Sequence, residues 1–311
     1  MLSKSKYCAF FQCPKRLWLQ TYHPELSEDN AALDARMETG NEVGDLAMGL
    51  FGDFTEVTAH KEDGRLDLSK MIAHTKQLVA ESHPVICEAS FSYEGNYCAV
   101  DILRRENGGY AIYEVKSATH EAEVYGIDIA YQKYVLEHCG ITVTGTYLVC
   151  INSDYVRGEE LDIQQLFKII DMSGWVELES PLVPGKIRHA GEILARKDEP
   201  THDIAERCED PYHCPFWKYC SRHLPEHSVF DLYRMTKKKK YDFYRKGIIS
   251  YADAMAVPSL SDTQLRQIQF QLWDRQITDI GNPVNHHFSH FLFFFRQQFR
   301  GLMQFQFRHG I

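Results

Sequence analysis

The sequence lacks any uninterrupted apolar run close to the roughly 20 residues that a membrane-spanning helix requires. Its opening, MLSKSKYCAFFQCPKRLW, has basic residues but no apolar core followed by a small-residue cleavage site, so a secretory signal is not expected. A phosphate-binding loop of the GxxxxGK[ST] type is also missing, which argues against an ATP-driven motor in this chain. These absences predict a cytoplasmic protein that depends on a partner for any motor activity.

A surplus of positive charge is missing as well, because 34 Lys and Arg residues face 43 Asp and Glu residues and the net charge is −9. This excludes a uniformly basic nucleic-acid-binding surface, but an enzyme that acts on nucleic acid needs only a local positive track. The first 24 residues form such a track, with Lys15 and Arg16 among aromatic residues and no acid before Glu25. Those aromatics could stack on bases or pack in the core, and the sequence leaves both open. The run from Lys237 to Lys240 is predicted to be a solvated helix face.

The apolar pattern predicts an α/β fold with a mixed central sheet. Residues 27–50 have helical spacing, and residues 84–116 alternate as three short strands, with Asn107-Gly108-Gly109 as a turn between the last two. A helix over 126–138, ended by Gly140, precedes a strand over 145–151. Because a strand, a crossover helix and a strand imply parallel pairing, the sheet is expected to be mixed.

The domain organisation follows from these segments. We expect an N-terminal basic and aromatic helix over 1–23, a core over 24–198 that is largely helical after residue 160, and a cysteine-rich segment over 199–225. A helical extension is expected over 226–280. The remainder, 281–311, is rich in Phe and His and shows no clear period; a truncated further domain and altered sequence are the two interpretations, and no function is assigned to it.

One pair of predicted strands carries the residues most suggestive of chemistry. Glu114 and Lys116 are two residues apart on a strand, so they share a face, while Tyr113 and Val115 point to the opposite layer. Asp101 lies on the preceding strand and is expected to come opposite them. Two carboxylates can hold Mg²⁺ or Mn²⁺, and a lysine can orient water or stabilise charge on a phosphorane. The pattern therefore predicts phosphodiester hydrolysis, against the alternative of a salt-bridged polar sheet face.

Taken in order, Glu88, Asp101, Glu114-Val115-Lys116 and the Gln132 of AYQKYVL resemble the RecB-like branch of the PD-(D/E)XK nuclease superfamily. The resemblance implies the restriction-endonuclease-like core, with Asp101 and Glu114 as metal ligands, Lys116 as the catalytic lysine and Gln132 as a supporting polar residue. Glu88 is a further acidic candidate, with a paired structural glutamate as its alternative.

Two positions depart from that family's pattern. The tyrosine usual four residues after the glutamine is Leu136 here, with Tyr134 or Tyr131 nearby, and Tyr134 is also a candidate for contact with nucleic acid. The histidine usual on the preceding helix is absent from GNEVGDLA, where Glu42 is the substitute candidate for a metal ligand.

Metal binding is also predicted by the cysteines, because nine thiols in a reducing compartment are poorly explained by disulfides. Cys208, Cys214 and Cys220, with five residues between neighbours, form a strong signal for a metal site but supply only three ligands. Cys13, just before Pro14 at an expected helix start, is the best fourth ligand. Cys8 is its rival. The remaining thiols, Cys87, Cys98, Cys139 and Cys150, are expected to pack as small hydrophobes.

One early and three late cysteines around an ExK core resemble the iron–sulfur nucleases of the CRISPR-associated RecB-like exonuclease family and of bacterial helicase–nuclease subunits. The opening LSKSKYCAFFQCPKRLWLQ is closer to an uncharacterised bacterial family in which a nuclease-like region precedes a further domain. The resemblance, over about residues 1–280, implies a [4Fe-4S] cluster beside the DNA path. Zinc is the alternative, with His213 or His202 replacing a cysteine.

The leading hypothesis is thus a metal-dependent DNA nuclease, an exonuclease on ends or single strands, with DNA and a helicase or other DNA-processing protein as partners. A non-catalytic nucleic-acid-binding module and a redox-sensing iron–sulfur protein are the rivals. Asp101, Glu114 and Lys116, all present together, favour the enzyme.

Overall fold

The computed structural model describes residues 1–28 and 31–280, and divides the chain into unit 1, Met1–Arg222, and unit 2, which begins at His223. The predicted tail over 281–311 lies outside the described residues. No helix in the described part of the chain has the length and apolar character needed to cross a membrane.

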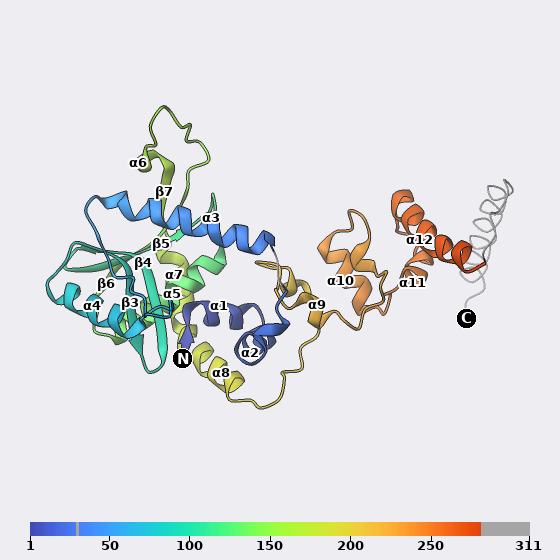
Figure 1. Ribbon diagram of the computed structural model, residues 1–311, viewed down its shortest axis with the longest axis horizontal. Helices are drawn as coiled ribbons and strands as arrows, with labels where there is room; N and C mark the ends of the chain where they lie inside the picture. The colour runs from blue at the N-terminus through green and yellow to red at the C-terminus, as the bar shows by residue number, and fades with distance from the viewer. Residues whose placement is uncertain (29–30, 281–311) are drawn as a thin grey trace. The chain divides into compact units, whose positions relative to one another are not determined.

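Unit 1 is built around one mixed sheet, so the predicted α/β class is confirmed (Figure 1). Its strands follow the order β2-β3-β4-β5-β6-β7, and β1 pairs with β4 in addition. The pairs β1/β4, β2/β3 and β5/β6 are parallel, and the others are antiparallel. The strands are β1 Leu2–Ser3, β2 Thr55–Glu56, β3 Val85–Tyr93, β4 Asn96–Glu106, β5 Gly109–Lys116, β6 Val143–Ile151 and β7 Phe167–Asp171.

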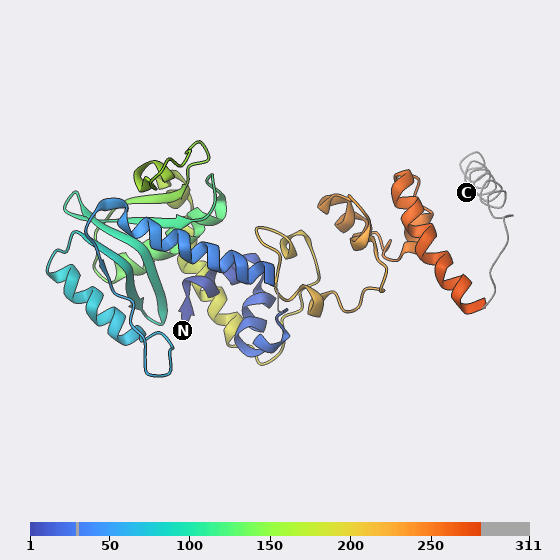
Figure 2. The same ribbon diagram turned by 45° about the horizontal axis from the view of Figure 1, so that its top comes forward.

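Helices cover both faces of this sheet. Figure 2 shows α3, Ala31–Met48, crossing one face, where Ala47 and Met48 pack in a core cluster with Tyr113 and Val115 of β5. The other face is covered by α5, Glu123–His138, which contacts β3, β4, β5 and β6. Since β5 lies between the two layers, its alternate side chains enter two different environments. The remaining helices of unit 1 are α1 Lys4–Gln12, α2 Pro14–Tyr22, α4 Leu68–Ala80, α6 Ile163–Leu166, α7 Ser173–Glu179, α8 Val183–Leu194 and α9 Trp217–Cys220.

Local signals explain the central hairpin and the crossover helix. Asn107 and Gly108 both have positive φ, 50° and 80°, as a tight hairpin turn between right-twisted strands requires. The crossover helix ends where Gly140 adopts φ 83° and the Ile141 amide donates to the Leu136 carbonyl, a glycine-based helix end. These features confirm the predicted turn, the helix before Gly140 and the parallel return strand.

The segment 160–198 is largely helical, as predicted, but the sequence did not predict β7, which adds an edge strand to β6 and on which Ile169 is 46% exposed. Pairing with the neighbouring strand, and not an apolar alternation in its own sequence, determines the β conformation of such a half-exposed edge strand. Two expectations about unit 1 were wrong. The single helix expected over 1–23 is two helices, since Cys13 has extended backbone and Pro14 starts α2. Cys139 is exposed at the end of α5 and does not pack in the core, unlike the buried Cys87, Cys98 and Cys150.

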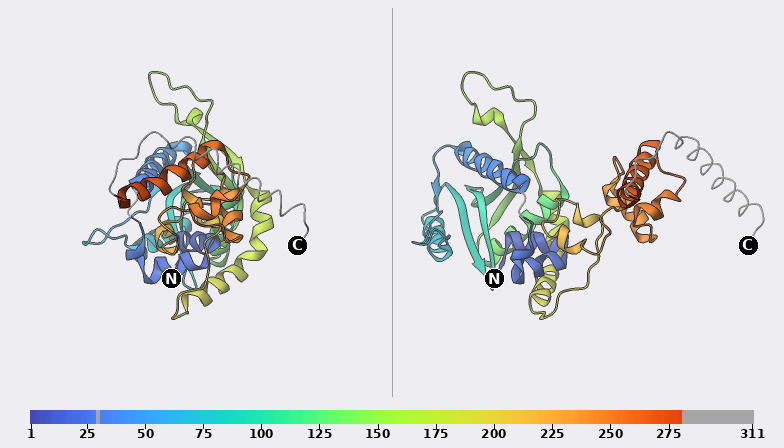
Figure 3. Two further views of the ribbon diagram at one scale, coloured as in Figure 1. Left: turned by 90° about the vertical axis from the view of Figure 1, so that its right-hand side faces the viewer. Right: turned by 45° about the vertical axis from the view of Figure 1, so that its right-hand side comes forward.

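Unit 2 is a small helical body, as predicted for residues 226–280, and it has a core of its own. The helices α10 Lys237–Arg245, α11 Tyr251–Met255 and α12 Asp262–Ile280 appear in orange to red in Figure 3. Val229, Tyr251, Ala254 and Ile268 are almost fully buried among them. The start of this body is three residues earlier than the sequence suggested.

Candidate functional site

Three carboxylates lie at matching positions on three neighbouring strands. The β3–β4 ladder keeps one register on either side of Glu88, which places that residue opposite Asp101. On β5, Glu114 is 0% exposed, and the amide next to it, from Val115, donates to Asp101 Oδ2 at 2.7 Å. The expected approach of Asp101 to the ExK segment is therefore observed.

Two lysines neutralise Glu114. Lys116 donates to Glu114 Oε1 on the shared face of β5, and Lys4, from the first turn of α1, donates to Glu114 Oε1 and Oε2 at 3.1 and 3.2 Å. The Lys4 ammonium also lies 3.5 Å from Asp101 Oδ1. One cation therefore bridges the two carboxylates proposed as metal ligands.

Helix α5 supplies two more polar groups one turn apart. Gln132 Nε2 donates to Glu114 Oε2 at 2.7 Å, and Asp128 Oδ2 accepts from Lys116 Nζ at 3.0 Å. Both residues are buried, with 0% and 5% exposure. Sequence reasoning found Gln132 but missed Asp128 and assigned Lys4 no place in the site. The spacing of four between Asp128 and Gln132 on one helix face was the available signal.

Burial and mutual repulsion set the protonation of this cluster. Burial would raise the pKa of Glu114, but Lys116 and Lys4 hold it well below its usual range. Burial and the Glu114 charge raise the pKa of Asp128 to about 6, and burial and Asp101 raise that of Glu88 to about 7. At neutral pH the cluster thus carries an ionised Glu114 beside the carboxyl groups of Asp128 and Glu88, whose pKa values are raised.

The donor set fits a divalent cation. Asp128 Oδ1 and Gln132 Oε1 are buried oxygens that lack a hydrogen-bond partner among the described residues, and buried acceptors of this kind normally have one. Carboxylate and amide oxygens are the ligands that Mg²⁺ and Mn²⁺ prefer. A purely structural salt bridge would leave these two oxygens without a partner.

Four of the candidates from sequence lie outside this cluster. Glu42 is exposed on α3 and does not join the network. Lys15 forms an ion pair with Glu199, and Arg16 donates to the side chain of Gln12. The ring of Tyr134 lies against His138, 4.1 Å between centroids.

The neighbouring aromatic and apolar positions serve the core. Tyr131 is buried, stacks on Tyr7 and donates to the Leu2 carbonyl, and Leu136 is fully buried. Among the early aromatics, Phe10 and Trp18 are also buried, at 7% and 5% exposure, so core packing is the correct interpretation for them and for Tyr7.

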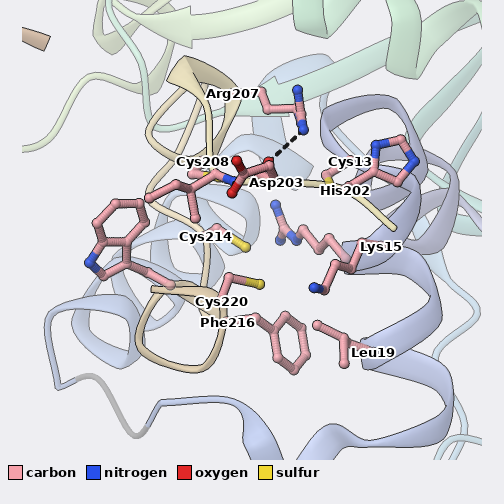
Figure 4. Close-up of a pocket in the computed structure, with 13 residues that line it drawn as sticks. Cys13, Lys15, Leu19, His202, Asp203, Arg207, Cys208, Cys214, Phe216 and Cys220 are labelled. Atoms are coloured by element: carbon pink, nitrogen blue, oxygen red, sulfur yellow. Dashed lines mark hydrogen bonds between the residues drawn. The ribbon is translucent and has the colours of Figure 1, made fainter. Parts of the chain in front are cut away.

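The predicted cysteine set lines one pocket, shown in Figure 4. Cys13 reaches it from the break between α1 and α2, Cys220 from the last residue of α9, and Cys208 and Cys214 from the loop before α9. Backbone bonds shape that loop, with the Cys214 amide donating to the Cys208 carbonyl at 2.7 Å. Gln12 Nε2 donates to the carbonyls of Arg207 and Tyr212 and so ties the loop to α1.

Positive charge surrounds these sulfurs. Arg16 and Arg207 line the pocket, and the Nε of each is buried without a partner in the described part of the chain. Four thiolates around a metal or an iron–sulfur cluster carry net negative charge, which such donors would stabilise. Burial raises the pKa of Cys214 to about 11 and also raises the pKa values of Cys208 and Cys220, so a bound cation would favour the thiolate form of these three. The four cysteines and the two arginines therefore fit a metal ion or an iron–sulfur cluster.

The geometry also separates the alternatives for the fourth ligand. Cys8 lies on α1 within electrostatic reach of Asp128, Lys116 and Lys4, and does not line the sulfur pocket. His202 lines it, but His213 does not. Within the described residues, no three Cys, His, Asp or Glu side chains are already drawn together as the ligands of a single ion.

Comparison with known proteins identifies no family for this chain. No protein-family model matches the sequence, and no curated protein matches it. Function therefore has to be argued from the two sites.

Proposed function

We propose that this chain is a metal-dependent DNA nuclease of the RecB-like PD-(D/E)XK type, acting as an exonuclease on ends or single strands. The observation that carries the proposal is the meeting of Asp101, Glu114 and Lys116 on one face of a mixed sheet, with Gln132 of the following helix bonded to Glu114. A salt-bridged sheet face needs no glutamine on that helix and no unpaired oxygens beside it.

The residues of the carboxylate cluster have separate roles in the proposed phosphodiester hydrolysis. A bound Mg²⁺ or Mn²⁺ would polarise the phosphate and lower the pKa of the attacking water. Asp101 and Glu114 would hold that ion, and Gln132 fixes the Glu114 carboxylate by its hydrogen bond. Asp128 holds the Lys116 ammonium, which can orient water and stabilise negative charge on the reacting phosphate.

The sulfur pocket would hold a [4Fe-4S] cluster, with zinc as the alternative. Cys13, Cys208, Cys214 and Cys220 are the ligands in this proposal, which rests on their common pocket and the arginines around it. Ligation would close a loop of nearly two hundred residues and stabilise the fold by restricting the unfolded chain. The cluster is thus assigned a structural role beside the nuclease core.

The decisive test is cleavage of end-labelled single- and double-stranded DNA with Mn²⁺ or Mg²⁺, after anaerobic purification. Lys116→Ala should abolish cutting, while the matched control Lys133→Ala, which removes a partly exposed lysine paired with Glu137 on α5, should cut like the wild type. Equal loss in both variants, or cutting that survives Lys116→Ala, would contradict the assignment. DNA binding without cutting in the wild type would favour the non-catalytic module.

The metal assignment is tested separately with two cysteine variants. Cys13→Ser should lose bound iron and the broad visible absorption of a cluster, whereas Cys8→Ser should retain both. Stoichiometric zinc with no iron in the anaerobic wild type would replace the cluster by a zinc site. Iron retained in Cys13→Ser and lost in Cys8→Ser would reverse the choice of fourth ligand.

A further inference from the structure

A second pocket lies within unit 2, where the segment entering α10 meets the segment entering α12. Its lining includes two cations, Arg234 and Lys239, and the hydroxyl groups of Thr236, Ser259, Ser261 and Thr263. The described residues that line it include no carboxylate. In a chain of net charge −9, a pocket of cations and hydroxyl donors is a selective environment for an anion.

Hydrogen bonds hold the walls of this pocket in place. The Tyr233 amide donates to Gln267 Oε1 at 2.8 Å, and Gln264 Nε2 donates to the Tyr233 carbonyl at 2.9 Å. Lys239 Nζ donates to the Ser259 carbonyl at 2.6 Å, which joins the two segments. Arg234 has φ 50°, a left-handed conformation that non-glycine residues rarely adopt. The pocket is thus fixed before any ligand arrives.

Asp262 lies between the lining residues Ser261 and Thr263 but does not itself line the pocket, and three other acidic residues of unit 2 have partners of their own. Asp231 and Asp253 each close a capping box, with Ser228 and Ser250, and Asp242 pairs with Arg245. The lysine run of α10 is also not one uniform solvated face, since Lys239 and Lys240 both bond to backbone carbonyls of neighbouring loops. The carboxylates of Asp231, Asp242 and Asp253 therefore have partners other than the cations at the pocket.

We propose that this pocket binds a backbone phosphate of a single-stranded nucleic acid, separately from the carboxylate cluster of unit 1. Several oxygens of a phosphodiester can accept from Arg234, Lys239 and the surrounding hydroxyl groups at once. Tyr233, at the rim, is 53% exposed, and the Arg234 guanidinium lies 5.1 Å from its ring centroid. An exposed ring beside a phosphate site offers a stacking surface for an unpaired base, which a duplex does not present.

The test uses the full chain, EDTA and a fluorescein-labelled oligothymidylate, with binding followed by anisotropy as salt is varied. Arg234→Asn removes the charge with a residue that tolerates positive φ. It should weaken binding about tenfold and reduce the salt slope by about 1, while Arg234→Lys should restore much of the affinity. Tyr233→Ala should weaken binding of the single strand more than that of a duplex of equal length.

Lys246→Ala is the matched control, because it removes an exposed cation of the same unit that does not line the pocket. It should bind within twofold of the wild type. Equal weakening by Lys246→Ala and Arg234→Asn would indicate a diffuse basic surface and overturn the proposal. The proposal would also be overturned if anionic lipid vesicles bound the wild type but not Arg234→Asn, and the oligonucleotide bound neither protein. Because no cleavage is measured, failure of the nuclease proposal would not affect the result.

Discussion

Replacing Lys4 by methionine should tighten the binding of Mn²⁺ to the carboxylate cluster. In the structure the Lys4 ammonium contacts both oxygens of Glu114, at 3.1 and 3.2 Å, and lies 3.5 Å from Asp101. Any cation that bridges these carboxylates must compete with it for the same oxygens. Methionine keeps an unbranched side chain as far as Cε and removes the competing ammonium group.

The size of the effect follows from the contacts that must be broken. A hydrogen bond to a charged group contributes about 1.5–3 kcal/mol, and 1.4 kcal/mol corresponds to tenfold in affinity. Lys4→Met should therefore lower the Kd for Mn²⁺ by roughly ten- to hundredfold. Loss of the Lys4 charge also leaves Asp101 and Glu114 repelling each other, which a bound divalent ion relieves.

Isothermal titration of Mn²⁺ without DNA is the assay, at a pH above 7 so that the carboxyls are ionised. Lys6→Met, two residues along α1, is the matched control and should bind Mn²⁺ like the wild type. An unchanged or higher Kd in Lys4→Met would refute the competition and show that Lys4 supports the ion. The titration is independent of whether the protein cuts DNA.

Two further predictions concern the fold. The pKa of Glu88 is raised to about 7, above its unfolded value of about 4.3, so the contribution of Glu88 to the stability of the wild type should fall as pH rises between these values. Glu88→Gln lacks this loss, and its Tm advantage in EDTA should grow from pH 5 to pH 8; a constant difference would contradict the assignment. A Cβ on Gly126 would lie 2.7 Å from the Trp175 Cβ, so Gly126→Ala should lower the free energy of unfolding in urea by about 1–3 kcal/mol. Gly174→Ala, which meets no atom within 4 Å, should not, and equal losses would reject the packing argument.

The sequence predicted the elements whose signals are local. The hairpin at Asn107-Gly108 and the end of α5 at Gly140 depend on left-handed backbone that a few residue types adopt. The shared face of Glu114 and Lys116 follows from strand alternation alone. The common pocket of the four predicted cysteines was inferred from the grouping of Cys208, Cys214 and Cys220, from the position of Cys13 before Pro14 and from the family resemblance.

Other features were beyond the reach of local patterns. Lys4 meets Glu114 across 110 positions, and only the packing of α1 against the sheet brings them together. The pairing of β1 with β4 involves two residues, too few to show any period. Asp128 was accessible in principle, since it lies one turn before Gln132, but its meaning depended on knowing which face of α5 meets Lys116.

Helix α1 lies between the two sites of unit 1 and contributes a residue to each of them at its two ends. Its first residue, Lys4, contacts the carboxylates, and the residue after its last, Cys13, lines the sulfur pocket. Nine helical residues span about 13 Å, and a helix changes its length very little. One short helix therefore separates the Lys4 ammonium from the sulfur pocket, with no loop between its two ends.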